Sequence, residues 1–323
     1  MLRFSDVDSN VHGQFRELLT ALNGRSKSPT YNLRVANRLF FAHGFQVRRS
    51  FRTACIRNYR AYAKRLNFAA DPDRCRRFIN KWVAKRTLQK IRELLPRRAV
   101  DRGTSLVLVN AIYFRSSWRF RFDERRTSLR PFHVSRTEEV DTEMMDTKAT
   151  LRLGRISSFR CKIVEIPYAN DDAAMYVLLP DDIDGLPRLE DGLTVTILDD
   201  AIDAMRAVTN ARLTLPKFKM EEQFDLRATL GDMGIGDLFT AAADLSGMSE
   251  TRGLFVSGVV HKAYIDVTEQ GTEAAAATAV ITIGRTSFRP LSVVANRPFL
   301  FLIREGRTRS VVFIGRYVRP PTG

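Results

Sequence analysis

One stretch of small residues near the C-terminal end most constrains what this chain can fold into. Gly271-Thr272 leads into Glu273-Ala-Ala-Ala-Ala-Thr-Ala279, and β-branched residues continue the segment to Ile283. Alanine favours helices, but the preceding glycine and the following β-branched residues favour an extended chain. At a period of two, one face would carry only small side chains: Thr272, Ala274, Ala276 and Thr278. The segment can therefore lie exposed as a loop or enter a β-sheet without steric cost.

Five further motifs occur along the chain. They are Leu106–Phe114 (LVLVNAIYF), Leu215–Phe218 (LPKF), Ala243–Gly247 (ADLSG), Val260–Ala263 (VHKA) and Asn296–Phe299 (NRPF). With the small-residue stretch, these motifs resemble the serpins in the family's order over essentially the whole chain. Serpins inhibit proteases by inserting a cleaved loop into their own sheet, which is an established example of strand addition.

The resemblance implies an α+β protein with the serpin fold. We expect a large mixed central β-sheet, further sheets, helices clustered in the N-terminal half and an exposed reactive loop. No linker or repeat divides the sequence, so residues 1–323 are expected to form one serpin domain, with hinge and reactive-centre loop at 269–298. Against the family pattern, the first helices and one strand are expected to be missing from this chain.

The hinge and the bait also follow from the resemblance. The hinge residues would be Glu269, Gly271, Thr272, Glu273, Ala274, Ala275, Ala276, Ala277 and Thr278. By the family spacing, the scissile bond lies sixteen residues after Glu269, between Arg285 and Thr286. Trypsin-like proteases select arginine or lysine before that bond, and Gly284-Arg285 resembles the antithrombin site. Arg289 is the rival, but it precedes a proline, before which such enzymes cut poorly.

These motifs predict an inhibitor of trypsin-like serine proteases and not an enzyme. Its targets would resemble trypsin or thrombin. The protein would be a suicide substrate, cleaved at Arg285–Thr286 before the loop inserts. The alternative is a non-inhibitory serpin that binds or carries a polyanion. The absence of proline from residues 272–283 favours insertion and therefore the inhibitor.

A second set of residues is expected where the sheet must part. The resemblance implies that Asn110 and His261 lie together there and that Trp118 lies near the top of the sheet, where insertion starts. A buried amide needs partners, because an unpaired one costs about 1–3 kcal/mol. A histidine beside an asparagine lacks a nucleophile, so we expect a structural, gating network.

Positive charge is concentrated early in the chain. Residues 48–98 hold 17 lysines and arginines against three acids, a net +14 of the total +16. We expect Arg48 and Arg52 on a second helix, and a stripe of Arg74, Arg77, Lys81 and Lys85 on a third. A solvated face is one interpretation. A heparin-like sulfated glycosaminoglycan is the other, because like charges repel until a polyanion binds. Nucleic acid is judged unlikely, since no aromatic platform is evident.

Other features of the sequence bear on disulfides, membrane spans, cofactors and localisation. Three cysteines without metal-like spacing indicate no disulfide framework, and no apolar run is long enough for a membrane span. No cofactor or metal is expected, and the protein is expected to be a monomer. The first residues lack a secretory signal, but the resemblance to secreted inhibitors implies an extracellular, secreted protein.

Residue periodicity predicts the individual elements. Helices are expected at 11–22, 47–62, from 72 onward, within 186–208 and at 226–239. Strands are expected at 31–41, 66–68, 106–114, on both sides of 168–172, at 213–218 and 254–267, and as a closing pair at 299–303 and 311–314.

Overall fold

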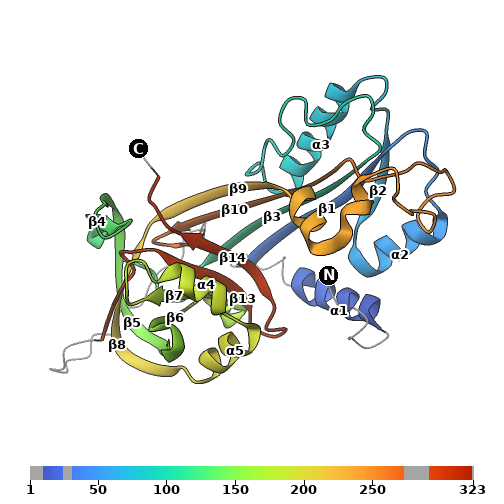
Figure 1. Ribbon diagram of the computed structural model, residues 1–323. Helices are drawn as coiled ribbons and strands as arrows, with labels where there is room; N and C mark the ends of the chain where they lie inside the picture. Colours follow the sequence, from blue (N-terminus) through green and yellow to red (C-terminus); the bar gives the residue numbers. More distant parts are fainter. Residues whose placement is uncertain (1–9, 25–30, 273–290, 322–323) are drawn as a thin grey trace. The chain divides into compact units, whose positions relative to one another are not determined.

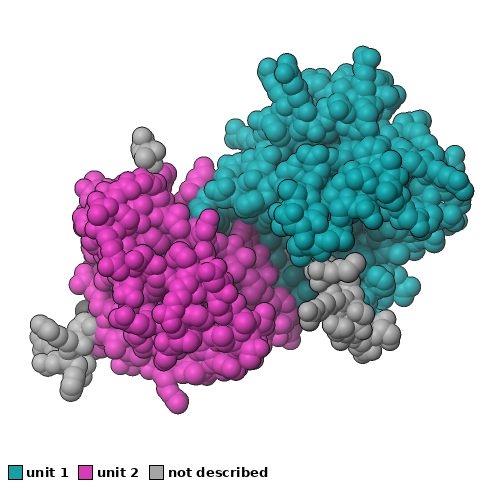
Figure 2. Space-filling view, viewed as in Figure 1, with its two compact units in different colours: residues 1–27, 32–114, 220–265 teal, residues 28–31, 115–219, 266–323 magenta. Residues whose placement is uncertain are grey.

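The computed structural model describes residues 10–24, 31–272 and 291–321. Two compact units divide the chain, and Figure 2 colours them separately. Unit 1 comprises residues 1–27, 32–114 and 220–265, and unit 2 comprises residues 28–31, 115–219 and 266–323.

Unit 1 holds the N-terminal helices and most of one β-sheet (Figure 1). Its elements are α1 (Val11–Gly24), β1 (Tyr31–Ala42), α2 (Arg49–Tyr59), β2 (Tyr62–Leu66), α3 (Pro72–Arg86), most of β3 (Leu106–Ser117), β9 (Phe218–Asp225) and β10 (Gly258–Thr268), and the short turns α6 (Arg227–Leu230), η5 (Gly231–Ile235) and η6 (Gly236–Phe239). The six-stranded sheet has the order β2-β1-β3-β11-β10-β9, with β11 described below, and β3 also pairs directly with β10.

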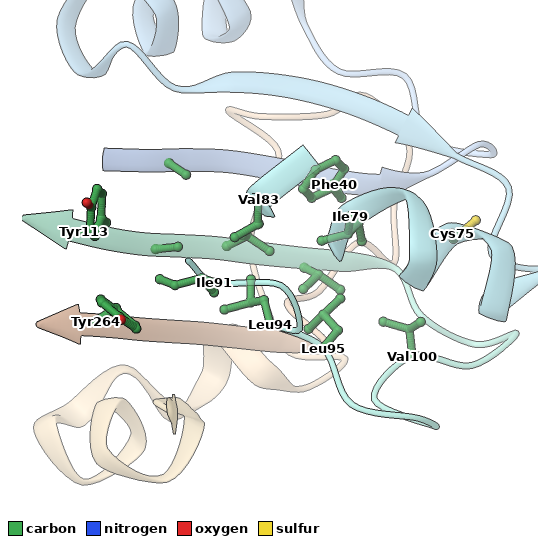
Figure 3. Close-up of a cluster of buried hydrophobic side chains, with 14 of the residues drawn as sticks. Phe40, Cys75, Ile79, Val83, Ile91, Leu94, Leu95, Val100, Tyr113 and Tyr264 are labelled. Carbon is green, nitrogen blue, oxygen red and sulfur yellow. The ribbon is translucent and has the colours of Figure 1, made fainter. Parts of the chain in front are cut away.

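The third helix begins as the sequence predicts. Asp71 is the N-cap, and its side chain accepts a hydrogen bond from the Arg74 amide at 2.8 Å, while Pro72 occupies the first turn. One side of α3, with Ile79 and Val83, is fully buried against a cluster that includes Phe40 (Figure 3). This packing holds α3 against the sheet of unit 1.

The strands β3 and β10 form a parallel pair in unit 1. Their register runs from Val107 opposite Gly258 to Tyr113 opposite Tyr264. Alternate residues of β3, including Val109, join the cluster beneath α3. The other face carries Asn110.

Unit 2 is built on an eight-stranded sheet. Its elements are β4 (Ser128–His133), β5 (Glu139–Ile156), β6 (Cys161–Pro167), β7 (Ala173–Pro180), α4 (Leu186–Gly192), α5 (Val195–Asp203), β8 (Arg206–Pro216), β11 (Gly271–Thr272), β12 (Ser292–Val294), β13 (Phe299–Glu305) and β14 (Val311–Tyr317), with short turns η2 (Glu124–Arg126), η3 (Ser157–Phe159) and η4 (Ala169–Asp171). The order is β12-β8-β5-β6-β7-β13-β14, and β4 pairs with β5. Buried side chains of α4 and α5 pack on β6, β7 and β13.

The expected mixed α+β fold, with its large mixed sheets, is confirmed, and most predicted elements are present. Several boundaries were wrong. The second helix ends at Tyr59, because Arg60 adopts a left-handed conformation (φ 49°) and closes it. Tyr62 therefore starts β2, and the strand predicted at 66–68 lies at 62–66 instead.

Two further predictions also failed. Residues 226–239 do not form one helix, because Gly234 has φ +92° and separates short α, π and 3-10 turns. The predicted 213–218 strand is split, since Phe218 begins β9 after β8 ends at Pro216.

Several features bear on cofactors and surroundings. Cys55, Cys75 and Cys161 are free thiols. Within the described ranges, no cluster of three or more histidine, cysteine or acidic side chains could hold a metal ion. No described helix combines the length and apolarity needed to cross a membrane.

Candidate functional site

The first residues of the predicted hinge form the short strand β11 in unit 2. In β11, Gly271 lies opposite Ser117 of β3 and Thr268 of β10. Thr272 lies opposite Ser116 and Val267 in the same way, and both pairings are antiparallel. The hinge therefore starts a strand that has β3 on one side and β10 on the other.

Gly271 occupies a position where only glycine fits. Its φ is +149°, and a Cβ atom there would lie 2.2 Å from the backbone oxygen of Ser116 and 2.6 Å from the Cα of Ser117. Neither backbone atom can move aside by rotating a side chain. The Thr268 hydroxyl also donates to the Gly271 carbonyl at 2.9 Å, so the turn from β10 into β11 is tightly fixed.

Thr272 is anchored by two aromatic residues. It is fully buried, and its hydroxyl lies 2.8 Å from the Tyr168 hydroxyl. The Tyr168 ring stacks on Trp118, with centroids 4.5 Å apart and planes 10° apart. Trp118 in turn donates from Nε1 to the Thr268 carbonyl at 2.9 Å, and its backbone amide donates to the Gln270 carbonyl at 3.1 Å. Trp118 thus contacts the segment that leads into β11, and its role in insertion stays a prediction; Tyr168 was not predicted from the sequence.

Glu269 fixes the segment that leads into the hinge. Glu269 is only 6% exposed. Its Oε1 atom accepts hydrogen bonds from the Thr127 hydroxyl at 2.9 Å and from Lys217 Nζ at 3.3 Å. Burial disfavours the charged carboxylate, but hydrogen bonds from its own backbone amide, Thr127 and Lys217 outweigh it and lower the Glu269 pKa. Its backbone carbonyl accepts from the Phe122 amide at 2.9 Å. Glu269 is therefore an ionised anchor.

A polar contact joins β3 and β10 in unit 1. Asn110 and His261 are opposite each other in the parallel register, and the His261 ring donates from Nδ1 to Asn110 Oδ1. The Asn110 amide donates to Asn37 Oδ1, and Phe224 stacks on His261 with centroids 6.0 Å apart. Burial lowers the pKa of His261, so the ring is neutral near pH 7. The predicted pairing of Asn110 with His261 is confirmed, while its gating role stays a prediction.

The rest of the proposed loop lies outside the described residues. This applies to Glu273, Ala274, Ala275, Ala276, Ala277, Thr278, Arg285 and Thr286. Their assignments as hinge and scissile bond stay predictions.

The basic residues lie on the surface of unit 1. Arg74, Arg77, Lys81 and Lys85 are exposed on α3, and Arg77 pairs with Asp73 one turn earlier. Arg52 is exposed on α2. Arg48 is its N-cap and donates from Nε to the Ser246 carbonyl at 2.8 Å. Polyanion binding by these six residues stays a prediction.

Comparisons with known proteins agree with this geometry. Residues 1–320 match the family model described as Serpin (serine protease inhibitor). Human Serpin B3 is 40% identical over 321 residues, covering 98% of this chain and 81% of that protein. The leukocyte elastase inhibitor of Xenopus laevis is 39% identical over 320 residues, covering 98% and 84%.

Solved structures agree as well. Uncleaved ovalbumin superposes with a TM-score of 0.84 at 32% identity, covering 97% of this chain and 80% of that chain. Maspin superposes with a TM-score of 0.88 at 28% identity, covering 98% and 83%.

The comparisons also correct one expectation. The prediction of an extracellular, secreted protein is wrong, because the relatives found are serpins of clade B, an intracellular branch. That expectation rested on the resemblance to secreted inhibitors alone.

Proposed function

The chain belongs to the serpin family of serine protease inhibitors, which are not enzymes, and we propose that it is a suicide substrate of trypsin-like serine proteases. The protease would cleave the Arg285–Thr286 bond and form an acyl-enzyme on Arg285. The released hinge would then insert into the sheet between β3 and β10. We further propose that residues 1–323 act as one inhibitory domain whose hinge and reactive loop span 269–298.

The observation that carries this proposal is the position of β11. Gly271 and Thr272 are antiparallel to both β3 and β10, whereas β3 and β10 pair directly with each other from Val107 to Tyr113. Extending β11 would therefore exchange one parallel ladder for two antiparallel ladders. Antiparallel pairing is slightly more stable per residue, so the exchange favours insertion once the loop end is free.

The observed register supports the same mechanism. Continued beyond Thr272, it brings Thr278 opposite both Asn110 and His261. The threonine hydroxyl could then take the place of the direct contact between those two side chains. The same register gives the face beneath α3 three alanines in succession, at 275, 277 and 279, before Ile281 comes opposite Val107. Small side chains suit this face, because α3 already packs closely on β3.

Arg285 sets the expected class of protease. A buried unpaired charge is costly, so an arginine suits a pocket with an aspartate at its base better than the small pocket of elastase. One relative is named leukocyte elastase inhibitor, so an elastase belongs in the same test. A preference for elastase would move the scissile bond away from Arg285.

The test mixes the purified chain with trypsin, thrombin and elastase and resolves the products on a denaturing gel. We expect a complex with trypsin or thrombin that survives boiling, is lost in Arg285→Ala and is kept in Arg289→Ala. Ala276→Pro should be cleaved without a complex, because proline removes a ladder donor from the inserted strand. A complex that persists in Arg285→Ala would refute the assigned bond.

The second candidate is a non-inhibitory serpin that carries a polyanion such as heparin. It is favoured by the net charge of +14 over residues 48–98. Cleavage after Arg285 by every protease tested, with no complex, would favour this candidate. Retention on a heparin column that falls in Lys81→Gln/Lys85→Gln would then be expected.

A further inference from the structure

Two exposed aromatic side chains lie in the basic part of unit 1. Tyr62 on β2 is 47% exposed, and Phe78 on α3 is 41% exposed. A single exposed aromatic residue is ordinary. Each of these two rings, however, lies close to a cation, Arg38 for Tyr62 and Lys64 for Phe78.

Close ring–cation contacts join β1, β2 and α3. The Arg38 guanidinium lies 4.5 Å from the Trp82 ring centroid and 5.9 Å from that of Tyr62. Lys64 Nζ lies 5.9 Å from the Phe78 ring, and the Arg86 guanidinium lies 6.0 Å from the Trp82 ring. We call this the aromatic–basic surface: Arg38, Tyr62, Lys64, Phe78, Trp82 and Arg86.

Positive charge on this surface is poorly neutralised. Within residues 10–24, 31–272 and 291–321, no carboxylate forms an ion pair with Arg38, Lys64 or Arg86. Burial and the neighbouring Arg86 both lower the pKa of Arg38. The Arg38 Nε atom is also buried without a hydrogen-bond partner in that part of the chain. The surface therefore attracts anions.

The basic stripe of α3 extends this surface. Phe78 lies between Arg74 and Lys81 in the helical sequence, and Lys85 follows one turn later. Cations and aromatic rings therefore alternate along the same helix and onto the adjoining strand β2. Alternation of this kind is typical of surfaces that follow a phosphate backbone while stacking its bases.

We propose that the aromatic–basic surface binds single-stranded nucleic acid. Bases would stack on Tyr62 and Phe78, and the lysines and arginines would contact phosphates. A sulfated glycosaminoglycan has the negative charge but no aromatic ring to stack. A duplex hides its base faces, so it could use only the charge. The proposal does not depend on Arg285 or on loop insertion.

The test measures fluorescence anisotropy of a labelled 20-nucleotide single strand, its duplex and a heparin fragment of similar charge with the full chain. We expect the single strand to bind more tightly than the duplex. Tyr62→Leu and Phe78→Leu should each weaken single-strand binding by about tenfold and leave heparin binding unchanged. Lys81→Gln/Lys85→Gln should weaken both ligands and lower the salt slope by about 1.5.

Matched controls separate the surface from general effects. Leu129→Ala removes a 70% exposed apolar side chain of unit 2, and Arg125→Gln removes an 83% exposed arginine side chain there. Neither should change binding. Thermal melting of each variant checks that the fold is intact. The proposal is overturned if the duplex binds as tightly as the single strand, or if the leucine variants weaken heparin and single-strand binding equally or not at all.

Discussion

Substituting Gly271 with alanine tests the central role of β11. An added Cβ would lie 2.2 Å from the Ser116 oxygen, and the φ of +149° is one that alanine rarely adopts. Such backbone strain costs about 1–3 kcal/mol. The clash is with main chain, so β11 would have to leave its place. The buried hydrogen bond between Thr272 and Tyr168 would then be lost, which adds about 0.5–1.5 kcal/mol.

We therefore expect Gly271→Ala to lower the free energy of unfolding by about 1.5–4.5 kcal/mol. Urea denaturation of the uncleaved protein measures this directly. The stoichiometry of trypsin inhibition should also rise, because a displaced hinge starts insertion later and more of the protein is cleaved as substrate.

Gly231→Ala is the matched control. Gly231 has φ −60° and ψ −49°, and nothing lies within 4 Å of its added Cβ. Its stability and stoichiometry should stay near those of the unaltered protein. If Gly271→Ala behaves like Gly231→Ala in both assays, the pairing of β11 does not hold the hinge, and the reasoning is refuted.

Three other substitutions test separate contacts. Burial lowers the pKa of His261 from its ordinary value of 6.5. As the pH drops, the unfolded chain therefore binds the proton first, and the stability of the fold decreases from about pH 6.5 down through the folded pKa. His261→Gln should make the melting temperature less dependent on pH over that range. Thr278→Val should lower the melting temperature of the cleaved, inserted form, measured by calorimetry, and leave that of the uncleaved form unchanged. Equal changes in both forms would contradict the proposed register. Asp146 is buried and accepts from Arg212 at 2.8 Å and Thr214 at 3.0 Å; Asp146→Ala should cost about 1–3 kcal/mol in urea unfolding, and an unchanged midpoint would argue against it.

Local signals in the sequence predicted some elements well. Asp71 and Pro72 set the start of α3, because a cap and a proline act within one turn. The hinge could be predicted because its small residues form one contiguous run, and its assignment stays a prediction. Tyr168 was missed because it contacts Thr272 across 104 residues of sequence, and no local periodicity reports such a contact.

The aromatic–basic surface was missed for a related reason. Tyr62 was placed at the end of a helix predicted over 47–62, which in fact ends at Tyr59. Once Arg60 turns the chain, Tyr62 lies on β2, with Arg38 between its ring and that of Trp82 on α3. An error of one helical turn at a boundary thus concealed a surface composed of three elements.

Under the proposed mechanism, the contact between Asn110 and His261 would have opposite consequences before and after cleavage. Before cleavage it joins β3 and β10 at the middle of their parallel register, so it opposes separation of the strands. After cleavage, the register of β11, if continued, would bring Thr278 between the same two side chains, and a threonine hydroxyl can both donate and accept. The polar groups would then remain paired in both states, and no buried group would be left without a partner once insertion is complete. The cost of separating Asn110 from His261 would fall mainly on the transition between the states, which makes this contact a kinetic barrier more than a difference in final stability.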